Sequence, residues 1–225
     1  MLAGHVAAGF LGKRIAPSLS LGTVVLAALA ADLLWGVFLI AGIERFDIVQ
    51  RGTTLMNSEV VTQIAWSHSL AMDVLWAAFF AGSYFLLRRD RRGAWVLCGA
   101  VLSHWLLDFA SHRPDMPLVP GNARVFGLGL WVSIPATLVV EGGLWILAVV
   151  SYWRATNPKR PVVRYPFWIG FAVITAAWYN NIAGPPPASN NREAGIASLL
   201  FFSFIGAWAF GLNRLRPAGA ASGRM

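Results

Sequence analysis

Three residues spaced four apart, His104, Asp108 and His112, are the clearest candidates for chemistry in this chain. On an α-helix such residues lie on one face and drift by only about 40° at each step. A histidine and an aspartate at this spacing can offer two ligands to one metal ion, as paired histidines do in helical metal sites. The spacing therefore predicts one helix face that binds a divalent cation or carries protons.

Three more residues of the same kinds, His5, Asp32 and His68, belong to apolar stretches. With a helical rise of about 1.5 Å per residue, Asp32, His68, His104 and Asp108 fall in one layer, about 16–22 Å from one face of a membrane. Ionisable side chains inside a bilayer face the protein interior and usually mark function. We therefore predict that His68, His104 and Asp108 bind a metal ion, with Asp32 beside them.

Two further carboxylates, Asp73 and Glu141, are expected outside this layer. Asp73 lies about 140° around a helix from His68, and both carboxylates lie in the half of the membrane nearer its basic side. The position of His5, about 12 Å into the membrane on a short helix, leaves its role open.

The elements that position these residues are predicted to be membrane helices. The chain is 57% hydrophobic and only 12% charged, whereas soluble domains have about 25% charged residues. We predict an all-α, polytopic membrane helix bundle formed by residues 1–216, with a disordered tail over 217–225. A short half-helix over 2–12 precedes six predicted transmembrane helices at 19–43, 60–87, 93–112, 126–153, 166–183 and 196–215.

The net charge of +8 is carried mainly by alternate loops of this arrangement. Basic residues in short loops set membrane orientation, so the pattern predicts that both termini are cytoplasmic, and we expect no nucleic-acid partner. The chain has a single cysteine, Cys98, which excludes a disulfide within the chain and a cysteine-based metal site.

The order of the candidate residues over about the first 120 positions resembles a bacterial family. Gly4-His5 precedes Asp32, the pair His68-Ser69 follows, and Ser103-His104-Trp105-Leu106-Leu107-Asp108 runs into a proline-rich loop. This order resembles the YdjM-like family of inner-membrane, metal-dependent hydrolases, and the resemblance adds His5 as a candidate metal ligand. The sequence departs from the family where Ala30-Ala31-Asp32 replaces a Pro-Asp-x-Asp motif, and where Gln63-Ile64-Ala65-Trp66 lacks a further histidine.

Together these patterns favour a metal-dependent hydrolase that acts on a lipid or a lipid-linked ester or phosphoester near the outer leaflet of a bacterial inner membrane. Asp32 is the predicted general base, and His112 is predicted to contact a phosphate or leaving group. Zinc is the expected cation because imidazole dominates the ligands, with manganese or iron as alternatives. Two other functions stay open: a small proton-coupled transporter that uses the same residues as a relay, and a helper subunit that docks a partner through the Pro185-Pro186-Pro187 loop and the basic loops.

Overall fold

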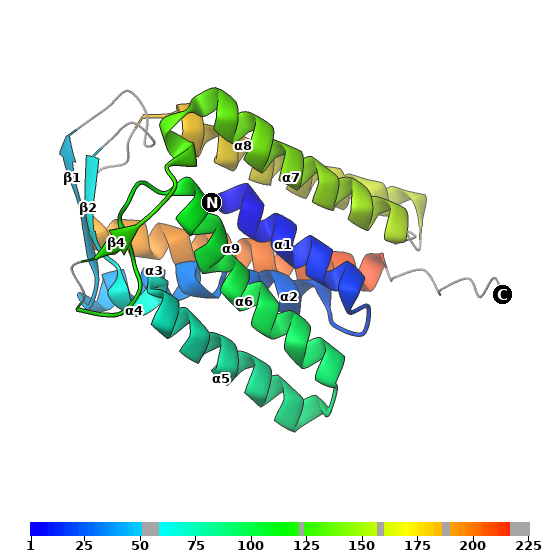
Figure 1. Ribbon diagram of the computed structural model, residues 1–225. Coiled ribbons are helices and arrows are strands. Elements are labelled where there is room, and N and C mark those ends of the chain that lie inside the picture. Colours follow the sequence, from blue (N-terminus) through cyan, green and yellow to red (C-terminus); the bar gives the residue numbers. More distant parts are fainter. Residues whose placement is uncertain (51–58, 122–123, 157–159, 186–189, 217–225) are drawn as a thin grey trace.

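The protein is a bundle of helices with two short β-hairpins at one end (Figure 1). The computed structural model describes residues 1–50, 59–121, 124–156, 160–185 and 190–216, so Pro186, Pro187 and the predicted tail lie outside the described residues. The α-helices are α1 (Leu2–Ile15), α2 (Leu21–Ala28), α3 (Ala30–Ala41), α4 (Ala65–His68), α5 (Leu70–Arg88), α6 (Arg91–Ser111), α7 (Ile134–Ala155), α8 (Arg164–Ala183) and α9 (Asn191–Leu215). The strands are β1 (Arg45–Gln50), β2 (Glu59–Gln63), β3 (Met116–Pro117) and β4 (Val125–Phe126), and short 3₁₀ turns, η2 (Leu130–Val132) and η3 (Pro161–Val163), precede α7 and α8.

Several of these helices are compatible with a multi-pass membrane protein. Within the described residues, α5, α6, α7 and α9 are long and apolar enough to cross a membrane, and the bent pair α2–α3 is a fifth candidate. The prediction of six membrane-spanning helices is therefore wrong. The predicted span at 166–183 does form a helix of 20 residues, α8, but Tyr179, Asn180 and Asn181 in its last turns and Arg164 at its start lower its hydropathy.

The first predicted span, 19–43, is broken rather than continuous. Helices α2 and α3 meet at an angle of 58°, and Leu29 between them has φ −100° and ψ 9°. No proline or glycine marks the break in Ala27-Ala28-Leu29-Ala30. Instead, the ring of His104 hydrogen-bonds the carbonyl oxygen of Ala28, and a side chain that enters the backbone ladder in this way is a recognised cause of a kink.

The second predicted span, 60–87, also contains three elements. Val60 and Val61 belong to strand β2, which pairs antiparallel with β1 from Arg45↔Gln63 onward. The single turn of α4 follows, and Ser69 then breaks the helix with an extended backbone and accepts a hydrogen bond from the Met72 N–H to begin α5. Three consecutive β-branched residues, Val60, Val61 and Thr62, favour a strand, which explains why this stretch does not start as a helix. Likewise, the stretch predicted as a span over 126–153 begins with β4 and η2, and its helix, α7, starts at Ile134.

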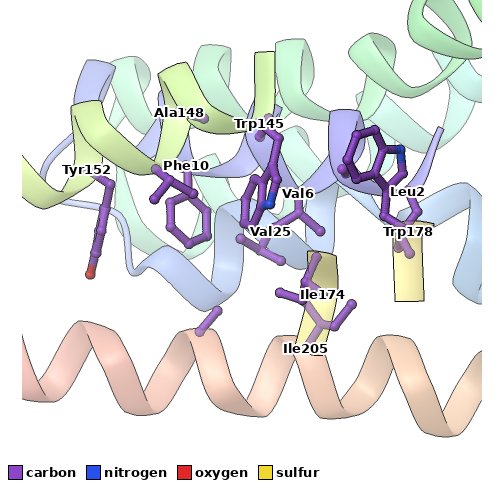
Figure 2. Packing of buried hydrophobic residues seen from close by; sticks show 14 of the residues in the cluster. Leu2, Val6, Phe10, Val25, Trp145, Ala148, Tyr152, Ile174, Trp178 and Ile205 are labelled. Atoms are coloured by element: carbon purple, nitrogen blue, oxygen red, sulfur yellow. The ribbon is translucent and has the colours of Figure 1, made fainter. Parts of the chain in front are cut away.

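Helix α1 lies among the other helices and has the short length expected of a half-helix. Its apolar side chains Leu2, Val6 and Phe10 pack against α2, α7, α8 and α9, where they meet Trp145 and Ile205 among others (Figure 2). The close crossing of α1 and α2 depends on Gly9, because a Cβ at this position would lie 2.7 Å from the Cα atom of Val25. This packing fixes the start of α1 inside the bundle.

Basic residues lie at the end of the bundle away from the hairpins (Figure 1). Helix α1 ends after Lys13 and Arg14, the turn from α5 to α6 is basic, and Arg154 and Arg214 lie in the last turns of α7 and α9. The two ends of the bundle therefore differ in charge. One end carries mainly basic residues, whereas the hairpin end carries acidic and basic residues together.

Candidate metal centre

Helix α6 positions two of the predicted ligands, His104 and Asp108. Asp90 accepts a hydrogen bond from the Gly93 N–H and so caps the start of this helix. His104 and Asp108 lie one turn apart on its buried face, and His104 Nε2 is 3.2 Å from Asp108 Oδ2. The four-residue spacing thus brings these two side chains together as predicted.

The other two predicted members of the cluster come from the breaks in the first two predicted spans. His68 is the last residue of α4, and its Nε2 atom lies 3.3 Å from His104 Nε2. Asp32 lies in the first turn of α3, and its Oδ1 atom lies 3.8 Å from His68 Nε2 and 3.9 Å from His104 Nε2. Irregular backbone at membrane depth is tolerated where it is buried in protein or lines a cavity, and here both breaks meet at the cluster.

The geometry of His68, His104 and Asp108 fits a small divalent cation. Ligand atoms at about 2.0–2.2 Å from a tetrahedral ion lie about 3.3–3.6 Å from one another. His104 Nε2 lies 3.3 Å from His68 Nε2 and 3.2 Å from Asp108 Oδ2, and His68 Nε2 lies 3.9 Å from Asp108 Oδ2. Buried His and Asp groups at this place could therefore hold a metal ion, either as His68, His104 and Asp108 or as His5, Asp32 and His104.

The orientation of His104 is fixed by its second ring nitrogen. Its Nδ1 atom lies 2.8 Å from the carbonyl oxygen of Ala28. A carbonyl oxygen can only accept a hydrogen bond, so Nδ1 carries the hydrogen and Nε2 directs its lone pair to the cluster. Metal-binding histidines commonly use their outer nitrogen in this way.

His5 lies against the cluster from α1. Its ring stacks on that of His104, with 3.6 Å between the ring centroids. Its Nε2 atom is 3.0 Å from Asp108 Oδ1 and 2.8 Å from the amino nitrogen of Met1, which in turn donates to Asp108 Oδ1 at 2.7 Å. The two carboxylate oxygens of Asp108 therefore have different neighbours. Oδ1 contacts Met1 and His5 of the α1 segment, and Oδ2 faces His104 and His68.

His112 is placed differently from His104 and Asp108. It follows the last residue of α6, where the backbone is already extended, and its Nδ1 atom lies 3.0 Å from Asp115 Oδ1. Its ring packs at 4.5 Å from that of Trp131. It belongs to neither group of side chains that could hold a metal, and its contact with a leaving group stays a prediction.

Asp73 and Glu141 are both buried, on α5 and α7. Glu141 Oε1 accepts a hydrogen bond from the Gly4 N–H at 3.2 Å, one residue before His5. Glu141 Oε2 has no hydrogen-bond partner among the described residues. Neither residue belongs to the groups that could hold a metal.

Two residues next to the cluster, Glu44 and Ser67, were not predicted as site residues. Glu44, which follows α3, is buried and accepts hydrogen bonds from the backbone N–H groups of Trp66 and Ser67 and from the Ser67 hydroxyl. Ser67 Oγ lies 2.6 Å from His68 Nδ1. Glu44 is 23 residues from Ser67 in the chain and belongs to a polar segment, so no local pattern indicates this contact.

Comparisons of the chain with protein-family models, with curated proteins and with solved structures found no match. The resemblance in the first half of the sequence therefore stays an expectation. The side chains that the fold brings together are therefore the basis for the function proposed below.

Proposed function

We propose that this protein is a membrane-embedded, divalent-metal-dependent hydrolase that acts on a lipid or a lipid-linked ester or phosphoester. The observation that carries the proposal is the group of three ligand atoms from His68, His104 and Asp108, which lie 3.2–3.9 Å from one another, with Asp32 Oδ1 3.8–3.9 Å from both histidines. Carboxylates buried without a cation or a proton would be costly in an apolar medium, so a bound cation would stabilise this arrangement.

Asp32 is more exposed to solvent than the other three side chains of the cluster. The side chains of His68, His104 and Asp108 are at most 8% exposed, whereas that of Asp32 is 16% exposed. A cation held there would polarise an ester or phosphoryl oxygen and make a coordinated water more acidic. Asp32 lies on the open side of the cluster, where it can take a proton from water as a general base.

A cavity of about 350 Å³ offers room for a polar head group at the hairpin end. It is lined by Gln63, Ile64 and Ala65 on one side and by Asp115, Pro117, Gly121 and Val125 on the other. The carbonyl oxygen of Ile64 accepts the His68 N–H at 2.8 Å, so the wall of the cavity is one helical turn from a candidate ligand. His112 contacts Asp115, which lines this cavity, and its contact with a phosphate or leaving group stays a prediction.

The basic residues at one end of the bundle support one orientation of the protein in the membrane. With the basic end in the cytoplasm, as the positive-inside rule favours, the last turns of α1 and α9 are cytoplasmic and the hairpin end faces outward. The expectation that the N-terminus is cytoplasmic does not fit this arrangement, because Met1 is buried beside Asp108 inside the bundle. The substrate then belongs to the outer leaflet of a bacterial inner membrane. Two imidazoles among the ligands favour zinc, and the two carboxylates also suit manganese or iron.

Hydrolysis by detergent-purified protein tests this proposal. The probes are p-nitrophenyl esters and phosphoesters and phospholipid mixed micelles, assayed after EDTA and after addition of zinc, manganese or iron. We expect metal-dependent turnover that His104→Ala abolishes and Asp32→Asn lowers by about 10²–10⁴-fold. Ser103→Ala is the matched control, since the Ser103 hydroxyl hydrogen-bonds the Ala100 carbonyl of its own helix. Absence of metal-dependent turnover with every probe would reject the hydrolase proposal.

One observation favours a proton-coupled transporter as the second candidate. The buried carboxylates Asp73 and Glu141 lie on helices either side of the stacked pair His5 and His104, so ionisable groups extend beyond the four ligands. Intramembrane chains of this kind serve as proton relays in transporters. Proton flux into dye-loaded liposomes that Glu141→Gln abolishes, without any bound metal, would favour this function over hydrolysis.

A further inference from the structure

Glu44 is a buried carboxylate, 1% exposed, that the proposed chemistry does not use directly. Helix α3 ends at Gly42, whose φ of 70° is in the left-handed region that favours glycine. The N–H groups of Ile43 and Glu44 then bond back to the Phe38 carbonyl oxygen. This turn ends α3, and the Glu44 that follows it contacts the backbone of α4.

Among the described residues, the side chain of Glu44 hydrogen-bonds only to the turn that carries His68. Its Oε1 atom accepts the N–H groups of Trp66 and Ser67 at 2.8 Å each, and its Oε2 atom accepts the Ser67 hydroxyl at 2.6 Å. The first N–H groups of a helix have no partner within the helix, so these two groups need an acceptor from elsewhere in the chain. Glu44 therefore fixes the backbone of α4 and the Ser67 hydroxyl together.

These contacts determine the direction of the hydrogen bond to His68. An ionised carboxylate can only accept, so the hydrogen of the Ser67 hydroxyl points to Glu44. Ser67 Oγ also lies 2.6 Å from His68 Nδ1. Because the hydroxyl has no second hydrogen to give, Nδ1 must carry one and donate it. The other ring nitrogen, Nε2, then has a free lone pair, and Nε2 is the atom that faces His104 and Asp108.

We propose that Glu44 and Ser67 are positioning residues that hold His68 in the tautomer whose Nε2 lone pair can bind a divalent cation. The proposal deepens the function proposed above and rests on it for the role of the cation. Its physical basis is a pair of hydrogen bonds with fixed directions. His68 Nδ1–H donates to Ser67 Oγ, and the Ser67 hydroxyl donates to Glu44 Oε2. Partners of this kind typically change metal affinity by about 10–100-fold when they are removed.

The variant Glu44→Gln separates positioning from simple packing. A glutamine has the same shape, and its amide oxygen can still accept the two backbone N–H groups that Oε1 accepts now. Its amide nitrogen then stands at Oε2 and donates to Ser67 Oγ. The Ser67 hydrogen must turn to His68 Nδ1, which moves the ring hydrogen to Nε2 and blocks the metal-binding lone pair. The fold stays intact while the tautomer reverses.

The experiment is ¹⁵N NMR of histidine-labelled protein in detergent micelles at about pH 8, with His68 assigned by its loss in His68→Gln, alongside titration with Zn²⁺. In the wild type we expect a protonated Nδ1 and an unprotonated Nε2 on His68. In Glu44→Gln we expect the reversed pattern and about 10–100-fold weaker zinc binding, with unchanged thermal unfolding. Glu193→Gln, at an exposed position in the first turn of α9, is the matched control and should behave as the wild type.

Substitutions of Ser67 complete the test. Ser67→Ala should leave the tautomer of His68 mixed and weaken zinc binding, and Ser67→Thr, which keeps the hydroxyl, should restore both. A wild-type His68 with its hydrogen on Nε2 would overturn the inference whether or not zinc binds. If wild type and Glu44→Gln share one ¹⁵N pattern and one zinc affinity, the positioning role is also wrong, although the metal site stands. If no form of the protein binds zinc but the tautomer reverses as expected, the proposed hydrolase fails and the positioning chain stands.

Discussion

The substitution Gly9→Ala tests whether the crossing of α1 and α2 holds the site in place. A methyl group at Gly9 would lie 2.7 Å from both the Cα and the Cγ2 atoms of Val25, where ordinary contact begins at 3.4 Å. The helices must therefore separate by about 0.7 Å, because a backbone atom cannot rotate aside as a flexible side chain can. Overpacking of this kind costs about 1–3 kcal/mol, which lowers the Tm of a chain this long by about 2–12 °C. Because His5 is one helical turn before Gly9, its stacking on His104 should loosen as well.

The assay is thermal unfolding in detergent, followed by circular dichroism. Gly99→Ala is the matched control: it lies on α6, the helix of His104 and Asp108, and an added Cβ there meets no atom within 4 Å. It should leave the stability unchanged or raise it by up to about 1 kcal/mol, the difference in helix propensity. Equal Tm values for the two variants would refute the close crossing of α1 and α2 as the element that positions His5.

Two further predictions concern groups outside the membrane-spanning segments. Arg216→Met should lower the free energy of unfolding by about 2 kcal/mol, because the buried guanidinium of Arg216 lies 4.0 Å over the Trp153 ring; the exposed Arg214→Met is the control, and an equal effect of both in a thermal melt would contradict the packing role. Asp90 has its pKa held below the ordinary value of 3.8, mainly by the hydrogen bond from the Gly93 N–H. Since a lowered pKa contributes stability that is present above pH 3.8 and lost as the pH falls through the folded-state pKa, wild-type Tm should drop more steeply below about pH 4 than that of Asp90→Asn, and parallel curves would show that the cap carries no charge-dependent stability.

Much of the fold follows from local patterns in the sequence, and the departures have physical causes. Helices α6 and α9, of 21 and 25 residues, each contain an apolar window long enough to cross a membrane, so length and hydropathy alone identify them. The break at Leu29 lacks proline and glycine, and depends instead on a hydrogen bond to His104, 76 residues from Ala28 in the chain. The strand β2 lies in an apolar stretch whose pairing with β1 depends on a distant segment. Tertiary contacts of this kind override local preference.

The candidate site was predictable where one helix carries it. His104 and Asp108 are one turn apart on α6, so their proximity follows from helix geometry. That His68 and Asp32 lie close to His104 was predicted from their similar depth in the membrane. The helix breaks near these two residues were not predicted, because no local sequence pattern indicates them. The four-residue periodicity fails at His112, because α6 ends at Ser111 and the chain turns toward Asp115. Glu44 was not predicted because its role depends on a turn at Gly42 and on a contact with Ser67 of α4, 23 residues later in the chain.

Metal content is the most direct test of the central claim that the buried His and Asp side chains form a metal centre. Detergent-purified wild type, His104→Ala and the control Ser103→Ala would be compared by mass spectrometry, with circular dichroism to confirm that each is folded. We predict about one divalent ion per chain in the wild type and in Ser103→Ala, and none in His104→Ala. A folded wild-type protein that binds no divalent ion, even when supplied with zinc, manganese and iron, would contradict the account.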